Sequence, residues 1–154
     1  MGLNQQTSTA AGVALLRVSL GVMYLAHSIL LKVMTFGLAG TAGYFVSLGL
    51  PKWLAYATVA AEALGGLAIL LGIKARWVAL ALSPILVGAL ATAHAHNGWV
   101  FSAPGGGWEY PAYLLVLSIA QFLLGDGAWA LRPSAPIQLT LRERRPAQAA
   151  PRLA

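Results

Sequence analysis

The sequence contains no cysteine and very few charged residues. Only four of the 154 residues are Asp or Glu, and charged side chains make up 9% of the chain. Without cysteine, the chain alone cannot perform thiol or disulfide chemistry and cannot hold a metal or an iron–sulfur cluster through thiolate ligands. Any redox role therefore requires a bound cofactor. Such a low charge content also lies far outside the range of soluble globular domains.

Most of the residues that are present are apolar. Hydrophobic side chains make up 58% of the sequence and the mean hydropathy is +0.72, so a bilayer is the expected solvent and membrane lipid an expected partner. The net charge of +6 could suggest nucleic acid. However, the basic residues lie in the tail and at the ends of apolar runs instead of forming a patch with interleaved aromatics. We therefore expect no nucleic-acid binding.

Four apolar runs are predicted to be transmembrane helices. A helix needs about 20 apolar residues to cross the hydrocarbon core. The predicted spans are residues 11–34, 53–71, 76–95 and 109–127. The expected fold is therefore all-α, an integral-membrane antiparallel bundle of four transmembrane helices at residues 11–131. A short N-terminal segment, residues 1–10, precedes it, and the basic residues 132–154, rich in Pro and Ala, are expected to form a disordered tail.

The basic residues predict how these helices are oriented. An even number of spans places both termini on one side of the membrane. That side carries Lys74, Arg76, Arg132 and the four arginines of the tail. The other side has Lys32 and Lys52 against Glu109. Because basic residues concentrate in cytoplasmic segments, both termini are expected in the cytoplasm.

Glu62 lies near the middle of the second predicted span. An ionisable group at membrane depth costs roughly 2.5 to 3.5 kcal/mol on insertion scales, so it needs a partner or a hydrated cavity. Gly65 and Gly66 follow on nearly the same helix face, and their missing side chains allow another helix to approach closely. Glu62 is therefore expected to face the interior of the bundle.

A polar stripe on the first span is expected to face Glu62. The stripe consists of Arg17, Gly21, Tyr24 and Ser28, at spacings of four, three and four residues that define one helical face. His27 flanks this stripe. The helical rise places Glu62 between the depths of Arg17 and His27, within reach of both side chains. Asp126 is a second predicted partner for Arg17.

Two interpretations of these buried charges stay open. In the first, Arg17 forms a buried ion pair with Glu62 or Asp126 that fixes helix register and performs no chemistry. In the second, Glu62 with His27 or Tyr24 lines a cavity that holds a quinone headgroup or a proton. The candidate catalytic residues are then Glu62, Arg17 and His27. The candidate cofactor-binding residues are Tyr24, Ser28 and Glu62.

The connection before the fourth span contains a candidate metal site. His94, His96 and Glu109, joined by His27, offer suitable ligand types. On a regular helix, residues two apart point to different faces, so both His94 and His96 can bind one metal only if the helix has ended there. Interfacial histidines satisfied by water and backbone are the more common case. The run at residues 105–107 lacks the Lys and Ser/Thr of a phosphate loop, which excludes nucleotide binding, and flexibility before a helix start explains its glycines.

A set of short motifs runs in order along residues 13–131. They are Arg17, Gly21, Lys32, Ser47-Leu48-Gly49-Leu50-Pro51, Glu62, Gly65-Gly66, Leu71-Gly72, Arg76, His94, Gly106-Gly107-Trp108-Glu109-Tyr110-Pro111 and Gly125-Asp126-Gly127. This ordered set resembles the DoxX family of small four-helix membrane proteins. Ile29, Leu30 and Leu31 stand where small residues are expected, so we expect the outer end of the first span to pack differently.

The resemblance implies a bundle in a bacterial-type inner (plasma) membrane. The family's name comes from similarity to a small subunit of a thiosulfate:quinone oxidoreductase. It therefore favours a quinone-linked subunit of an oxidoreductase system with a membrane or periplasmic redox protein as partner. Relatives that reduce disulfides use Cys pairs, which this chain lacks. Two alternatives stay open. The first is a non-catalytic membrane interaction or assembly protein. The second is a small-molecule or ion carrier with Glu62 as the mid-membrane site, and because four spans show no internal repeat, a carrier is expected to be a homo-oligomer.

Overall fold

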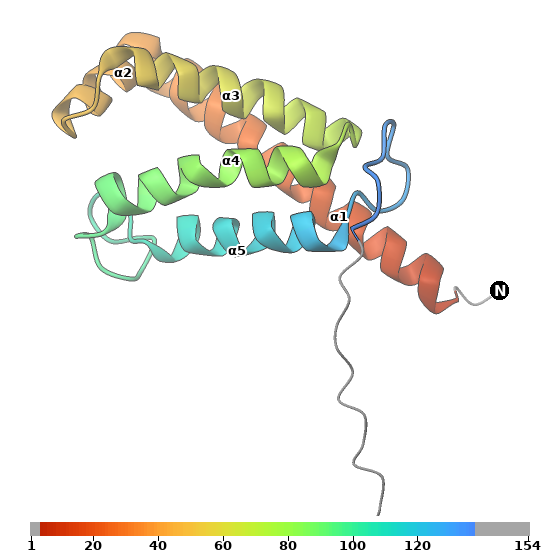
Figure 1. Cartoon of the computed structure of the whole chain (residues 1–154). Coiled ribbons are helices and arrows are strands. Elements are labelled where there is room, and N and C mark those ends of the chain that lie inside the picture. The colour runs from red at the N-terminus through yellow and green to blue at the C-terminus, as the bar shows by residue number, and fades with distance from the viewer. Residues whose placement is uncertain (1–3, 138–154) are drawn as a thin grey trace, which may run out of the picture.

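The regular elements of the protein are all helices (Figure 1). The computed structural model describes residues 4–137. Its elements are α1 (Gln5–Leu25), η1 (Ala26–Thr35), α2 (Gly37–Ser47), α3 (Lys52–Leu71), α4 (Ala75–Ala89), η2 (Leu90–His94) and α5 (Glu109–Leu124). The two η elements are π-helices that directly continue α1 and α4. The predicted all-α fold is therefore confirmed.

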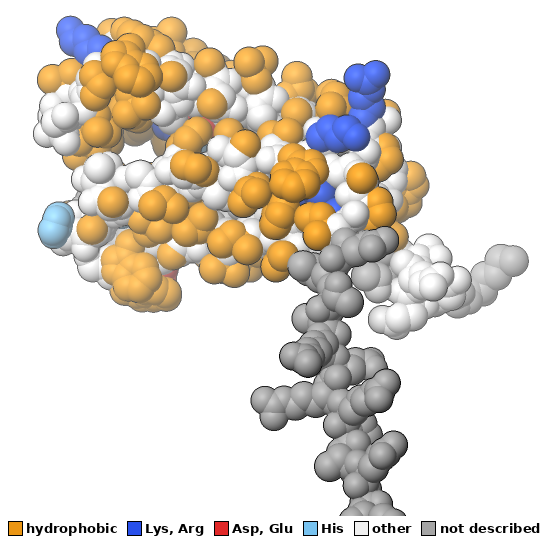
Figure 2. Space-filling model, viewed as in Figure 1, with side chains coloured by type: hydrophobic (Ala, Val, Ile, Leu, Met, Phe, Trp, Pro, Cys, Tyr) orange, Lys and Arg blue, Asp and Glu red, His pale blue; other side chains and the backbone are white. Residues whose placement is uncertain are grey.

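Three of the continuous helices are long and apolar enough to cross a membrane. They are Gln5–Thr35, Lys52–Leu71 and Ala75–His94. The helix α5 is also apolar but has only 16 residues. At a rise of 1.5 Å per residue it is about 24 Å long, against a hydrocarbon core of roughly 30 Å. Large apolar side chains cover much of the outer surface in Figure 2, as expected of a multi-pass membrane protein.

The helices form two layers (Figure 1). The first contains α1, η1, α2 and α3, and the second contains α4 and α5 side by side. Glycines bring the helices together: a Cβ added at Gly21 of α1 would lie 2.7 Å from the backbone nitrogen of Leu70, and one at Gly66 would lie 2.9 Å from the Cβ of Tyr24. Gly65 similarly admits Leu82 of α4. The predicted role of Gly65 and Gly66 in close helix contact is confirmed.

The helix α1 begins earlier than predicted. Its first residue is Gln5, within the segment expected to precede the bundle. The reason is local, because the side chain of Asn4 accepts a hydrogen bond from the backbone N–H of Thr7 at 2.8 Å and so caps the helix start.

The segment after α5 folds back across the end of the bundle. The backbone N–H groups of Leu131 and Arg132 donate to the carbonyls of Leu71 and Gly72 at 3.1 and 3.0 Å. The N–H of Lys74 donates in turn to the carbonyl of Arg132 at 2.9 Å. A tail boundary at residue 132 is therefore too early, because the free peptide groups of the α3–α4 turn bind this segment. The rest of the predicted tail, residues 138–154, lies outside the described residues.

Candidate functional site

Glu62 forms an ion pair with Lys32, which joins α3 to η1. The side chain of Glu62 is 4% exposed and that of Lys32 is 18% exposed, so the expectation that Glu62 faces the interior is confirmed. The expected partners of Glu62 were wrong, since neither Arg17 nor His27 pairs with it. Side chains tilt toward the N-terminus of their helix, and the ammonium of Lys32 therefore reaches back from the outer end of η1 to the depth of Glu62.

A signal for Lys32 was present in the sequence. The residue follows Ser28 by four positions and so continues the polar stripe of the first span. Lys32 had a place in the motif set and a role in the predicted orientation, but no contact with Glu62 was predicted for it. Of the residues described, Lys32 is the main functional candidate that sequence reasoning missed.

Arg17 lies at the opposite end of the bundle. Its guanidinium donates hydrogen bonds to the backbone carbonyls of Asp126, Ala128 and Trp129, the last two at 3.0 and 3.4 Å. The predicted contact between Arg17 and Asp126 is thus made through a carbonyl and not through the carboxylate. Arg17 therefore holds the segment that follows α5 against α1. The structure does not bring the Arg17 side chain to Glu62.

The carboxylate of Asp126 fastens the same end. It accepts hydrogen bonds from the backbone N–H groups of Arg76, at 2.7 Å, and Ser134. The guanidinium of Arg76 donates to the carbonyls of Phe122 and Leu123 at 2.8 and 2.9 Å. Cationic donors suit the C-terminal end of a helix, where carbonyls lack intrahelical partners. These residues therefore hold α4, α5 and the following segment together.

Tyr24 and Ser28 are both buried, as their place on the polar stripe predicts. The hydroxyl of Tyr24 lies 3.0 Å from that of Ser118 on α5, and the hydroxyl of Ser28 donates to the carbonyl of Val59 at 2.9 Å. Tyr24 also packs against α3 one turn beyond Glu62, where a Cβ at Gly66 would lie 2.9 Å from the Cβ of Tyr24. Ser28 serves the packing of η1 on α3, whereas Tyr24 lies beside the ion pair.

His27 lies on η1 next to the ion pair. Its ring packs on that of Tyr110 from α5, with 5.5 Å between the ring centroids. His27 directly precedes Ser28, whose hydroxyl bonds to Val59 of α3, three residues before Glu62. We call Tyr24, His27, Lys32 and Glu62 the polar cluster. Two of the predicted catalytic residues, Glu62 and His27, therefore belong to one group of side chains.

The polar cluster is partly open to the outside. Figure 2 shows a recess between the α2–α3 layer and the α4 helix, at the end of the molecule that carries α2, with blue and red side-chain atoms inside it. The partial exposure of the Lys32 side chain agrees with this opening. The ion pair is therefore not fully sealed from its surroundings, because the Lys32 side chain keeps part of its surface exposed.

The predicted metal ligands His94, His96 and Glu109 are not assembled into a site. Within residues 4–137 no three His, Asp or Glu side chains gather where they could hold one metal ion. The Nδ1 of His94 lies 2.9 Å from the carbonyl oxygen of Gly106, and the carboxylate of Glu109 accepts from the N–H of Phe101 at 2.8 Å. Both side chains thus organise the loop between η2 and α5.

That loop is built on its glycines, and the expectation that they only provide flexibility is wrong. A Cβ at Gly107 would lie 2.2 Å from the carbonyl oxygen of Val100, and Gly105 and Gly106 have φ values of +80° and +75°. The side-chain amide of Asn97 donates to the carbonyls of Gly105 and Gly106, both at 3.0 Å. The loop therefore has a fixed, hydrogen-bonded shape that other residues would strain.

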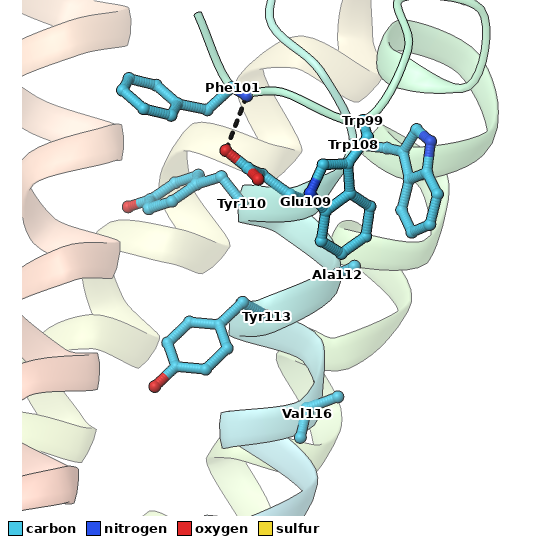
Figure 3. Close-up of a pocket in the computed structure, with 8 residues that line it drawn as sticks. All are labelled: Trp99, Phe101, Trp108, Glu109, Tyr110, Ala112, Tyr113 and Val116. Atoms are coloured by element: carbon cyan, nitrogen blue, oxygen red, sulfur yellow. Dashed lines mark hydrogen bonds between the residues drawn. The ribbon is translucent and has the colours of Figure 1, made fainter.

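An open pocket of about 460 Å³ lies against the N-terminal end of α5 (Figure 3). Its lining residues are Trp99, Phe101, Trp108, Glu109, Tyr110, Ala112, Tyr113 and Val116. We call this the aromatic groove. The rings of Trp99 and Trp108 meet edge to face, 4.4 Å apart, which is a favourable aromatic geometry. Tyr110 belongs to the groove and also packs on His27, so the groove adjoins the polar cluster.

Comparisons with known proteins agree with the membrane architecture. The DoxX family model matches residues 12–95, which contain Lys32, Glu62 and His94. The chain is 34% identical over 122 residues to the Bacillus subtilis (strain 168) protein named "Putative oxidoreductase CatD", a match that covers 79% of this chain and 85% of that protein. No solved structure gives a significant match. The matched region and the similarity along most of both chains show that this protein belongs to the DoxX family.

Proposed function

We propose that this protein is the membrane subunit of a quinone-linked oxidoreductase system and that it holds a quinone headgroup at the polar cluster. The observation that carries the proposal is the ion pair of Lys32 and Glu62, which lies inside the bundle while the Lys32 side chain stays partly exposed. Charged groups at this depth are expensive and usually functional. The name of the Bacillus subtilis relative supports the oxidoreductase class.

The residues of the cluster fit a quinone headgroup. The headgroup is a planar ring with two carbonyl oxygens, so it needs hydrogen-bond donors and apolar or aromatic walls. Lys32 has three N–H donors, of which Glu62 takes one, and an imidazole offers another N–H. The neighbouring ring of Tyr110 supplies an aromatic wall. The donors Lys32 and His27 would hold the carbonyl oxygens, and Glu62 would orient Lys32.

The chemistry expected of this chain is the handling of protons. Reduction of a quinone to a quinol takes up two electrons and two protons. We assign the electrons to the redox centre of a membrane or periplasmic partner protein. Glu62 and His27 both exchange protons readily when their environment allows it; Glu62 pairs with Lys32 and His27 lies on the same π-helix as Lys32. They are therefore the groups that would deliver protons to the bound ring.

The proposal includes a location and an orientation. We place the protein in a bacterial-type plasma membrane with both termini in the cytoplasm. Lys74 and Arg132 lie at the end of the bundle where α1 begins, as the preference of basic residues for the cytoplasmic side requires. The short helix α5 would complete a fourth crossing together with the loop before it, where Trp99 and Trp108 suit the membrane interface.

The proposal predicts that purified protein retains a quinone. Protein isolated in mild detergent would be extracted with organic solvent and analysed by mass spectrometry. We expect wild type to carry quinone and the Glu62→Gln and His27→Gln variants to retain about tenfold less, a loss of roughly 1.4 kcal/mol. Glu62→Gln removes the anion that orients Lys32, and His27→Gln removes the imidazole donor. Glutamine keeps the size of Glu62, and its amide oxygen can still accept a hydrogen bond from the partly exposed Lys32, so the variant should still fold.

The matched control is Lys52→Gln, which removes an exposed charge at the same end of the bundle. This variant should retain as much quinone as wild type. Circular dichroism and elution volume would show that each variant is folded. If wild type carries no quinone and also fails to bind added ubiquinone, the quinone site is wrong, and a carrier or assembly role would replace it.

A further inference from the structure

We propose that the aromatic groove seats the isoprenoid tail of the quinone whose ring lies at the polar cluster. This inference rests on the proposed function and extends it, because it names the part of the ligand that the second site recognises. In this proposal Phe101 and Tyr113 determine how strongly the protein prefers a quinone that carries a tail.

The groove has a fixed shape before any ligand arrives. The N–H groups of Trp108 and Glu109 donate to the carbonyls of Gly98 and Trp99 at 3.0 and 3.1 Å, which ties the loop to the start of α5. In Figure 3 Phe101 lies on this loop at the N-terminal end of α5, above Tyr110. An aromatic belt at a membrane interface requires only that aromatic residues be present. A hydrogen-bonded loop that fixes their positions indicates a binding surface.

The lining of the groove suits an apolar chain. Phe101 and Tyr113 are 67% and 62% exposed, so their rings are available for contact. The carboxylate of Glu109 is already bonded to the N–H of Phe101. The remaining surface is aromatic and aliphatic, and an isoprenoid chain contacts such a surface through dispersion, without any need for hydrogen bonds.

Continuity with the polar cluster selects the occupant. The ring of Tyr110 lines the groove and also packs on His27, 5.5 Å between centroids. A quinone whose ring is held by Lys32 and His27 must direct its tail out of the recess. The route past Tyr110 leads into the groove, so one molecule can occupy both places. A lipid acyl chain has similar chemistry, but it carries no ring to anchor it at the cluster.

The test compares quinones that differ only in tail length. Ubiquinone-0, without a tail, and ubiquinone-2, with two isoprene units, would be titrated into wild type and a Phe101→Ala/Tyr113→Ala variant in nanodiscs, with tryptophan fluorescence as the signal. We expect the variant to bind ubiquinone-2 about tenfold more weakly than wild type does. Its affinity for ubiquinone-0 should not change. The control is Phe36→Ala, an aromatic residue of similar exposure, 59%, outside the groove.

The outcomes separate this inference from the proposed function. If the double variant binds both quinones as wild type does, the tail does not use the groove, while the quinone site itself stands. Equal weakening of both quinones would also overturn the inference, because the groove would then hold the ring. If wild type binds neither quinone, both proposals fall. A change of oligomeric state in the double variant, with quinone binding intact, would assign the groove to a second copy of the chain.

Discussion

Replacing Lys32 with methionine is expected to lower the free energy of unfolding by about 3–5 kcal/mol, because the change leaves Glu62 buried without its cation. Glu62 is 4% exposed and lies in the middle of α3, so its carboxylate has little contact with water that could replace the ammonium group. Methionine keeps most of the length and the apolar stem of lysine. The measurement is equilibrium unfolding in mixed detergent micelles, followed by circular dichroism.

The matched control is Lys52→Met, which removes an exposed lysine near the same end of the bundle. Its free energy of unfolding should stay within about 0.5 kcal/mol of wild type. A double variant, Lys32→Met with Glu62→Leu, should recover much of the loss, since well-packed apolar residues often replace a buried ion pair at little cost. If Lys32→Met is as stable as Lys52→Met, the ion pair does not hold η1 against α3.

The architecture could be predicted because its signals are long and local. Apolar runs of membrane length identify helices with no knowledge of the tertiary structure. The polar stripe could be predicted for the same reason, since helical spacing alone places Arg17, Tyr24 and Ser28 on one face, and all three are buried. Glu62 could be assigned to the interior of the bundle because an ionised carboxylate facing lipid costs free energy. None of these steps requires knowing which helices are neighbours.

The pairing of charges could not be predicted in the same way. Which cation reaches Glu62 depends on the relative depth of two helices and on the direction of each side chain, and spacing along one helix does not determine either. Arg17 was expected to turn toward Glu62. Free carbonyls at the end of the bundle bind it instead. Those carbonyls belong to the segment after α5, and local sequence patterns do not predict that this segment folds back across the bundle.

The π-helices are the other feature that the sequence does not reveal. They form i→i+5 hydrogen bonds and often occur at functional sites. Here η1 carries His27 and Lys32, two members of the polar cluster, and η2 ends at His94. The wider turn shifts side chains relative to the regular helical spacing of α1 and α4. This shift changes which side chains of η1 face α3, and regular helical spacing from α1 therefore does not predict that Lys32 reaches Glu62.

Gly21→Ala is expected to destabilise the protein by about 1–3 kcal/mol or more, as overpacking of a close contact does. The added Cβ would lie 2.7 and 2.8 Å from the backbone nitrogen and Cα of Leu70. Backbone atoms of a helix cannot rotate away, so α1 and α3 would have to move apart. The loss would be measured by the same unfolding experiment as for Lys32.

Gly12→Ala provides the control on the same helix, because a Cβ there meets no atom within 4 Å. Alanine favours helix by up to about 1 kcal/mol over glycine, so this variant should be neutral or slightly more stable. If Gly21→Ala and Gly12→Ala change the free energy of unfolding equally, α1 and α3 are not in close contact at Gly21. If the crossing is tight, Gly21→Ala should also reduce quinone retention, because α1 continues into η1 and sets the position of Lys32 relative to Glu62. A change of one methyl group far from the recess would then report on the geometry of the ion pair.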